Sequence, residues 1–191
     1  MKMDKAKQAI TAAIDLFGQQ GFDNTSTQSI AKHAGIGNAT LFKYFESKDV
    51  LIREAYLAAK KDLIACIKQG LDPTLSFEPM LRAIWLNFFS WCLEKPMMYS
   101  FVCQIASSRF HDAQVEELVD SEMLFFKMAI SSAKSNQQIA DLPLEVIQGT
   151  IMAFINLAVQ FHTEEPIVGE SVFYNLMLNS LEINQTQKEH L

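Results

Sequence analysis

Residues 25–48 read TSTQSIAKHAGIGNATLFKYFESK, and no other stretch of the chain carries so specific a pattern. Its first residues have the composition of a helix N-terminus. Thr25 and Gln28 stand in capping-box spacing, and the two hydroxyl residues between them are alternative caps. Gly35 follows where a left-handed helix end is expected, directly before Ile36, which would pack back into a core. The pattern predicts two short helices joined by a tight turn.

The second of these helices would begin at Gly37 or Asn38. It would place Leu41 and Phe45 inward, because residues four apart share one face of a helix. The opposite face then carries small, amide, hydroxyl and aromatic groups. Such a face suits the major groove of DNA, where amides pair with adenine and methyl groups contact thymine. The two helices have the layout of a helix-turn-helix unit.

The preceding segment completes a three-helix bundle. A helix is expected over residues 4–20, with Gly21 as its stop signal and Phe22 folded back against it. Its inward face carries apolar residues at helical spacing, namely Ile10, Ala13, Ile14 and Phe17.

With these three helices in place, the chain resembles the TetR family of transcriptional regulators. The resemblance covers roughly the first 55 residues and is specific, because several glycines and aromatics fall at fixed offsets. The matching residues are Ala13, Phe17, Gly21, Phe22, Thr25, Ile30, Ala31, Ala34, Gly35, Ile36, Thr40, Leu41, Phe45, Lys48 and Leu51. The resemblance implies a homodimer that binds a pseudo-palindromic, double-stranded DNA operator. It also implies that a ligand in the C-terminal domain releases the DNA.

Carried over position by position, the resemblance implies a set of DNA-binding residues: Thr27, Gln28, Asn38, Ala39, Thr40, Lys43, Tyr44 and Lys48. Base or groove contacts are expected from Gln28, Asn38, Ala39, Lys43 and Tyr44. Phosphate contacts are expected from Thr40, Tyr44 and Lys48.

Two positions depart from the family pattern. Phe42 stands where the family commonly has Tyr, so a hydroxyl directed at phosphate is missing. Gly37 and Asn38 replace the more common Ser-Lys pair, which removes a helix cap and a positive charge. The resemblance therefore implies DNA binding but does not transfer a particular operator sequence.

The net charge of −6 is divided unevenly along the chain. Residues 1–61 hold nine Lys/Arg and six Asp/Glu, whereas residues 62–191 hold seven and sixteen. Positive charge thus lies with the predicted DNA-binding segment, where dimerisation would double it. The acidic remainder favours a neutral or cationic ligand.

Composition predicts one or two ordered helical domains, since 49% of the residues are hydrophobic and glycine and proline are few. The N-terminus is amphipathic and carries several lysines without an apolar run, so it has no signal-peptide pattern. No stretch reaches the roughly 18 uninterrupted apolar residues of a membrane helix. We therefore expect a cytoplasmic protein with no membrane partner.

The sequence offers no pattern for catalysis. Cys66, Cys92 and Cys103 lack metal or disulfide spacing. Reduced core thiols are the main interpretation, and a Cys92–Cys103 redox switch is the alternative. Nucleophile–base pairs, phosphate loops and metal motifs are likewise missing from the sequence. We expect neither an enzyme nor a cofactor.

Helices are expected over residues 48–70, 77–94, 97–109, 113–135, 143–162 and 167–183. After residue 76 there are more aromatic and methionine side chains than one narrow stripe on each helix can hold. Such side chains can line an apolar ligand cavity, or they can fill a core that has none. The candidate ligand-binding residues are Trp85, Phe88, Phe89, Phe101, Gln104, Phe125 and Asn156.

The last two helices are the candidates for dimerisation. Residues 143–162 are apolar around nearly the whole helix circumference, so both sides need a cover. Two helices from each subunit would form a four-helix interface about a two-fold axis. The candidate contacts are Ile151, Ile155, Phe173, Leu176 and Met177.

These observations predict an all-α protein. Residues 1–50 would form a three-helix, helix-turn-helix DNA-binding domain, and residues 51–191 an antiparallel helical ligand-binding and dimerisation domain. The predicted function is that of a ligand-responsive repressor released by a small apolar, amphipathic or cationic effector. A helical small-molecule carrier without regulatory DNA binding is the alternative.

Overall fold

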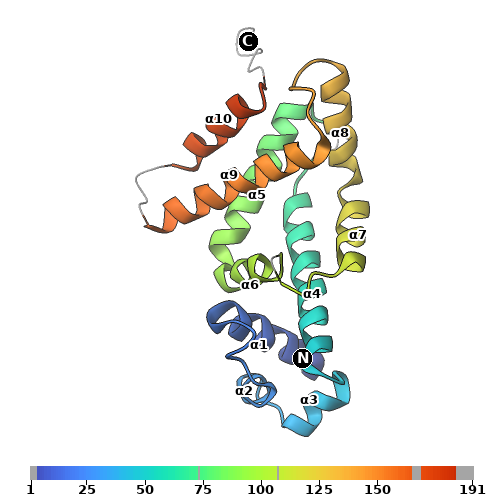
Figure 1. Cartoon of the computed structure of the whole chain (residues 1–191), viewed down its shortest axis with the longest axis vertical. Helices are drawn as coiled ribbons and strands as arrows, with labels where there is room; N and C mark the ends of the chain where they lie inside the picture. The colour runs from blue at the N-terminus through green and yellow to red at the C-terminus, as the bar shows by residue number, and fades with distance from the viewer. Residues whose placement is uncertain (1–3, 73, 107, 165–168, 184–191) are drawn as a thin grey trace. The chain divides into compact units, whose positions relative to one another are not determined.

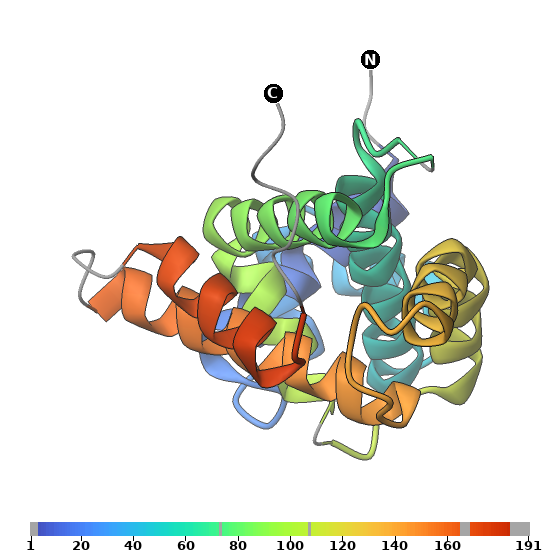
Figure 2. The same cartoon turned by 90° about the horizontal axis from the view of Figure 1, so that it is seen from above.

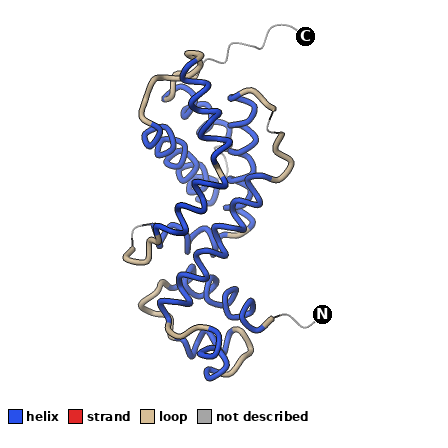
Figure 3. The backbone as a smooth tube through the Cα atoms, turned by 90° about the vertical axis from the view of Figure 1, so that its right-hand side faces the viewer, coloured by secondary structure: helices blue, strands red, loops and turns tan. Residues whose placement is uncertain are grey.

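The structure, a computed structural model, describes residues 4–72, 74–106, 108–164 and 169–183. Within these ranges it contains helices and no strand, which confirms the all-α prediction (Figure 3). The helices that Figure 1 labels are α1 (Lys5–Gln20), α2 (Thr27–His33), α3 (Asn38–Tyr44), α4 (Lys48–Lys68), α5 (Phe77–Glu94), α6 (Pro96–Ala106), α7 (Ala113–Glu122), α8 (Leu124–Ser135), α9 (Leu144–Glu164) and α10 (Glu170–Ser180).

The helices form two compact units. The first comprises Met1–Ala65 and Glu94–Ser121, and the second comprises Cys66–Leu93 and Glu122–Leu191. The first unit therefore holds α1 to α3, most of α4, and also α6 and α7. The predicted functional division into residues 1–50 and 51–191 places its boundary elsewhere and stays a prediction.

An aromatic cluster forms the centre of the first unit. Phe17 and Phe101 are fully buried, and their rings stack with centroids 5.8 Å apart. Phe22 lies 5.4 Å from Phe17 and 5.3 Å from Phe110, so the predicted fold-back of Phe22 onto α1 is confirmed. Each such ring pair contributes about 0.5–1.5 kcal/mol beyond the burial of its area. The cluster joins α1 to α6, which is distant in sequence.

The backbones of α1 and α6 approach each other closely at Gly18. A Cβ atom at this position would lie 2.0 Å from the carbonyl oxygen of Met97, so the packing requires glycine. The same approach allows Ser100 Oγ to donate a hydrogen bond to the Gly18 carbonyl at 2.8 Å. Gln104 Nε2 donates to the Phe17 carbonyl at 3.1 Å. Two side chains of α6 thus bind the last turn of α1.

Aromatic packing and an ion pair with its hydrogen bonds hold the second unit together. The Phe77 and Phe126 rings stack 6.3 Å apart, joining α5 to α8. At the start of α10, Glu170 accepts two hydrogen bonds from the Arg82 guanidinium, at 2.9 and 2.8 Å. Trp85 Nε1 donates a third to the same carboxylate at 2.8 Å. These charge-assisted bonds fix the start of α10 on α5.

The last two helices lie side by side within this unit (Figure 2). Ile155 of α9 and Met177 of α10 are fully buried, and Phe173 is 8% exposed. The Phe161 and Phe173 rings lie 5.4 Å apart, which adds an aromatic contact between the two helices. Each of these two helices thus uses one apolar face for packing within the second unit.

The prediction of one helix over residues 113–135 was wrong. The helix is interrupted at Met123: α7 ends at Glu122 and α8 begins at Leu124. The first and second units divide at the same place, between Ser121 and Glu122. Ser121 Oγ donates to the Leu118 carbonyl at 2.8 Å, and Glu122 is drawn into an ion pair with Lys68 at 2.6 Å. Serine bonding to its own helix is a known source of helix bending. Neither glycine nor proline marks the break, so the sequence pattern carried no signal for it.

Replacing Gly18 by Ala tests the close approach of α1 and α6. Helix propensity alone favours Ala by about 1 kcal/mol, but here its methyl group overlaps the Met97 carbonyl. We expect the free energy of unfolding to fall by about 1–3 kcal/mol, as for other overpacked sites, in urea denaturation followed by circular dichroism. Gln19→Ala is the control, because Gln19 is exposed on the same helix turn. Equal stability of the two variants would show that the helices do not meet at Gly18.

Candidate nucleic-acid interface

The first helix of the predicted DNA-binding segment is capped by Ser26. Its Oγ accepts a hydrogen bond from the Ser29 backbone N–H at 3.0 Å, and Ser29 Oγ returns one to the Ser26 carbonyl at 2.7 Å. Ser26 was one of the alternative caps, and the capping role expected for Thr25 is wrong. Thr25 is 1% exposed, and its hydroxyl donates to the Gly21 carbonyl at 2.6 Å. That bond closes the loop between α1 and α2.

The turn between α2 and α3 has the predicted geometry. Gly35 has a φ of +67°, in the left-handed region that favours glycine. The Ile36 N–H then donates to the Ala31 carbonyl at 3.0 Å and the Gly35 N–H donates to the Lys32 carbonyl at 3.1 Å. These bonds satisfy carbonyl groups that the helix end leaves open. The left-handed helix end at Gly35 is therefore confirmed.

The second helix, α3, presents its polar side to solvent. Leu41 is 1% exposed and Phe45 is 5% exposed, so both point inward as predicted. Gly37 is the N-cap residue and provides no side-chain bond, in agreement with the expected loss of a cap. Asn38, Ala39, Lys43 and Tyr44 are exposed, and Thr40 is half-buried.

The remaining predicted contacts lie on α2 and at the start of α4. Gln28 is exposed and Thr27 is half-buried. Lys48 is also half-buried, and its Nζ donates a hydrogen bond to the Phe22 carbonyl. An ammonium group has three donors, so Lys48 retains donors for a phosphate while it holds the loop after α1. All eight predicted DNA-binding residues belong to the first unit, and none of the eight is buried.

The charge and chemistry of this surface suit a polyanion. Residues 25–48 hold three lysines and one glutamate. Phe42 and Tyr44 are 44% and 48% exposed, so α3 leaves two aromatic side chains accessible beside its polar groups. The surface offers amide, hydroxyl, ammonium and aromatic groups from two adjacent helices.

A polar cluster that the sequence did not indicate braces α4. The Tyr56 hydroxyl donates to Glu116 of α7, and Lys60 Nζ lies 3.4 Å from the same carboxylate. Burial of the phenol, followed by its bond to the Glu116 carboxylate, raises the pKa of Tyr56 well above its ordinary value. Nearby, Arg53 Nε lies 2.7 Å from Asp112. The helix that begins at the DNA-binding segment is thus tied to α7 within the first unit.

The predicted ligand-binding residues fall into two groups. Phe101 and Gln104 belong to the first unit, where they pack α6 against α1. Trp85, Phe88, Phe89, Phe125 and Asn156 belong to the second unit. Trp85, Phe88 and Phe89 are buried, Phe125 is half-buried and Asn156 is exposed. The structure gives Phe101, Gln104 and Trp85 partners inside their own units.

The predicted dimerisation residues are mostly used within the chain. Ile151, Ile155, Phe173 and Met177 are buried in the second unit, and Leu176 is 47% exposed. The large apolar side chains that α9 and α10 leave exposed are Val146, Met152, Leu157, Phe161, Val172 and Leu176. The sequence analysis selected Leu176 as a dimerisation candidate and treated the helix over residues 143–162 as apolar all round, without selecting this side of it. The spacing of Gly149, Ala153 and Asn156, all exposed, marks the same side of α9 and was the available signal.

By length and composition α9 resembles a membrane span. Residues 144–162 have a mean hydropathy of 1.4, and 28% of the span is buried in the chain. A single helix of this kind is weak evidence for insertion, because the core helix of a soluble protein passes the same test of length and composition. Over the part of the chain that the structure describes, no group of three His, Cys, Asp or Glu side chains is placed to hold a metal ion.

Comparison with known proteins points to one family. Residues 9–55 match the model for bacterial regulatory proteins of the tetR family. An uncharacterized HTH-type transcriptional regulator of Haemophilus influenzae is 27% identical over 106 residues, which cover 56% of this chain and 57% of that protein. The chain spans about half the length of the curated relatives it matches.

Solved structures share the fold over almost the whole chain. A TetR family regulator from Marinobacter aquaeolei VT8 has a TM-score of 0.85 at 20% identity, covering 93% of this chain and 95% of that one. A putative tetR family regulator from Shewanella sp. PV-4 has a TM-score of 0.78 at 23% identity, covering 93% and 98%. At this level of identity the likeness concerns the fold.

The cap of α2 is a separate test of the interface geometry. Ser26→Ala removes the acceptor for the Ser29 N–H, and we expect a loss of about 1 kcal/mol in the free energy of unfolding. The Ser29 amide should also exchange with solvent faster. Thr27→Ala is the matched control and should change stability by no more than a few tenths of a kcal/mol. The cap assignment fails if the two variants unfold at the same urea concentration.

Proposed function

We propose that this chain, which belongs to the TetR family of bacterial regulatory proteins, is a cytoplasmic, ligand-responsive repressor. Proteins of this family are DNA-binding transcriptional regulators and not enzymes. This chain would bind a palindromic operator as a homodimer and leave it when a small apolar or amphipathic ligand binds. The observation that carries this proposal is the geometry of α2, the Gly35 turn and α3, with exposed amide, hydroxyl and ammonium groups on α3.

In this proposal α3 enters the major groove. Asn38 and Lys43 lie on its exposed side and carry the donors that recognise adenine and guanine edges. Ala39 offers a methyl group for thymine. Gln28 of α2 reaches a neighbouring base, and Thr40, Tyr44 and Lys48 contact phosphates, which orient the protein without reading sequence.

The exposed apolar stripe of α9 supports the homodimer. Val146, Leu157 and Phe161 are 47%, 39% and 37% exposed, although each is large and apolar. They recur at intervals close to whole helix turns, so they form one stripe, to which Gly149 and Ala153 add small side chains. A second copy would cover this stripe with the same stripe, as a two-fold axis requires.

The ligand response follows the ordinary rule of linked equilibria. A ligand releases DNA to the extent that it binds the DNA-free state more tightly than the DNA-bound state. The buried aromatic set of α5, including Trp85, Phe88 and Phe89, supports an apolar ligand. These residues lie in the second unit, outside the predicted DNA surface.

Selection of bound duplexes from a random DNA pool tests the proposal directly. Purified full-length protein at moderate salt should enrich an inverted repeat, because each protomer of a two-fold dimer reads one half-site. Half-sites should be centred about one helical turn of DNA apart, or a multiple of it. Folded protein that enriches no sequence would refute DNA-based regulation.

Two variants assign roles within the same selected operator. Lys48→Ala should weaken binding to all sequences alike and lower the salt slope by about one unit. Gln28→Ala should instead relax preference at one base position, with a cost of about 1–3 kcal/mol there. Lys61→Ala and Gln19→Ala are the matched controls, since both residues are exposed outside the proposed contacts. The assignments are wrong if Lys48→Ala and Gln28→Ala behave like these controls.

A charge placed on the α9 stripe tests the dimer. Leu157→Glu would bury an unpaired carboxylate between two copies, which is costly, and we expect the dimer dissociation constant to rise at least a hundredfold. Sedimentation equilibrium measures it. Met128→Glu is the control, because Met128 is a 64% exposed apolar side chain on α8. A Leu157→Glu protein that dimerises as tightly as Met128→Glu would place the interface elsewhere.

A further inference from the structure

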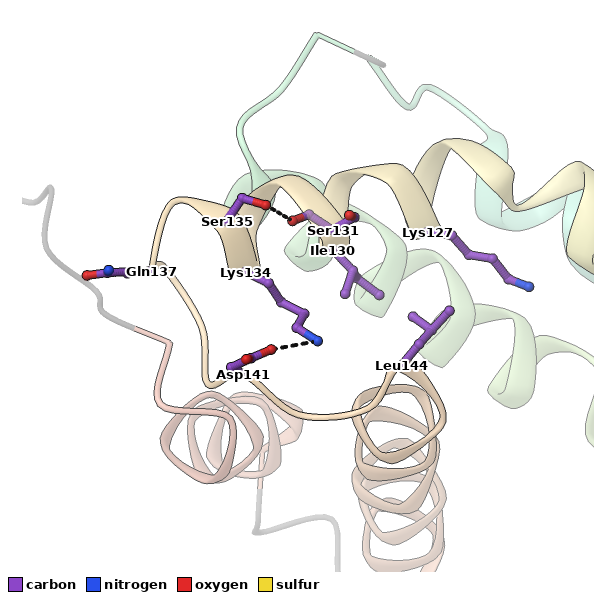
Figure 4. Close-up of a pocket in the computed structure, with 8 residues that line it drawn as sticks. All are labelled: Lys127, Ile130, Ser131, Lys134, Ser135, Gln137, Asp141 and Leu144. Carbon is purple, nitrogen blue, oxygen red and sulfur yellow. Dashed lines mark hydrogen bonds and ion pairs between the residues drawn. The ribbon is translucent and has the colours of Figure 1, made fainter.

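A hollow of about 620 Å³ opens between α8 and the start of α9, in the second unit. This volume falls within the range of about 300–1,000 Å³ usual for small-molecule sites. Figure 4 shows Lys127, Ile130 and Lys134 extending from α8 on the side from which Leu144 of α9 approaches. The hollow therefore combines two ammonium groups with two aliphatic side chains. None of the sequence-predicted ligand residues lines it.

The concentration of positive charge here is unusual for this half of the chain. The stretches 66–93 and 122–191 together hold five Lys/Arg and ten Asp/Glu. Two of the five cations line this one hollow. Elsewhere in these stretches, Lys68 and Arg82 form ion pairs with Glu122 and Glu170.

The position of Lys134 is set by its own loop. Its Nζ donates to the Leu142 carbonyl at 2.7 Å and lies 2.8 Å from Asp141 Oδ1. The Lys134 side chain is 27% exposed, whereas the Asp141 side chain is 91% exposed. The ammonium is therefore held by the backbone on one side and by a solvent-exposed carboxylate on the other. An exposed ion pair of this kind contributes at most about 1 kcal/mol, so another carboxylate can replace Asp141 at little cost.

We propose that this hollow binds an organic anion consisting of one carboxylate on a short aliphatic body. The carboxylate takes the place of Asp141 on Lys134, and Lys127 adds a second positive charge at the opposite end of the same helix face. Ser131, between the two lysines on α8, adds a hydroxyl to the lining. The aliphatic body lies against the half-buried Leu144, beside the buried Ile130, and its own apolar surface is removed from water there.

The site also lies where binding can reach the proposed dimer stripe. Asp141 precedes α9 by three residues, and Leu144 is the first residue of that helix. Exchange of Asp141 for a ligand carboxylate would release one of the two contacts that Lys134 makes with the loop leading into α9, because the bond to the Leu142 carbonyl remains. This regulatory consequence rests on the proposed function, whereas the anion site itself does not.

Calorimetric titration of the full chain with octanoate tests the site, with 1-octanol and inorganic phosphate as the probes of each half of the ligand. We expect saturable binding of octanoate that is at least tenfold tighter than binding of either 1-octanol or phosphate. Octanoate that fails to saturate, or 1-octanol that binds equally well, would overturn the proposal.

Three variants locate the binding. Lys134→Gln should weaken octanoate about tenfold, as expected for loss of a charged hydrogen bond. Asp141→Asn should tighten it about three- to fivefold, because the competing carboxylate is gone. Lys68→Gln is the control with the same charge change and should leave the affinity unaltered. The opposite signs matter, since a damaged fold would weaken binding in both hollow variants. Equal affinities in all three variants would place octanoate elsewhere and overturn the site.

A DNA-release measurement separates this site from the proposed function. Octanoate that binds as predicted and lowers operator affinity supports both. Octanoate that binds as predicted while the protein selects no operator supports the anion site and refutes the repressor. Loss of octanoate binding with operator selection intact does the reverse.

Discussion

The contact between Gly18 and the Met97 carbonyl sets the architecture of the first unit. Because no Cβ intervenes, α6 comes close enough for Ser100 and Gln104 to bind carbonyl groups in the last turn of α1. Both carbonyls lie at a helix end, where intrahelical partners become few, and the Phe17 carbonyl also accepts the Gly21 N–H at 2.9 Å. The aromatic cluster around Phe17 then fills the space beside the contact. The α2–α3 pair packs on α1, so the geometry of the DNA surface depends on a segment some eighty residues away in the chain.

In the second unit, a charged side chain fixes one helix to another. The start of α10 is held by the Glu170 carboxylate, which takes two bonds from Arg82 and one from Trp85. Tyr174 adds a bond to Glu78 at 3.1 Å, and burial chiefly raises the pKa of its phenol well above the ordinary value, so it stays a donor. With α10 fixed to α5 in this way, α9 needs only one face for its own unit. Its other face keeps exposed apolar side chains, among them Val146, Leu157 and Phe161.

The sequence predicted those parts of the structure that depend on a few neighbouring residues. The glycine at position 35, the i, i+4 pair Leu41 and Phe45, and a hydroxyl cap for α2 are local features, and all three were found. The choice among neighbouring hydroxyls failed because Thr25 is recruited by the loop after α1, a contact across several residues. Helix phase on α9 also could not be predicted. When a helix is apolar all round, only its neighbours decide which side they cover.

For the candidate ligand residues too, the sequence does not show which neighbours each side chain contacts. Phe101 and Gln104 were selected because an aromatic and an amide on an apolar helix are typical of a pocket; their ligand role stays a prediction, and in the structure they also pack α6 against α1. The expected ligand charge was drawn from the acidic C-terminal part as a whole. Net charge acts over distance and is screened beyond about 8–10 Å in physiological salt. A bound ligand instead meets the groups within a few ångströms, and at the α8–α9 hollow those groups include Lys127 and Lys134. The sign of a site therefore follows from its lining, and an acidic domain can hold an anion.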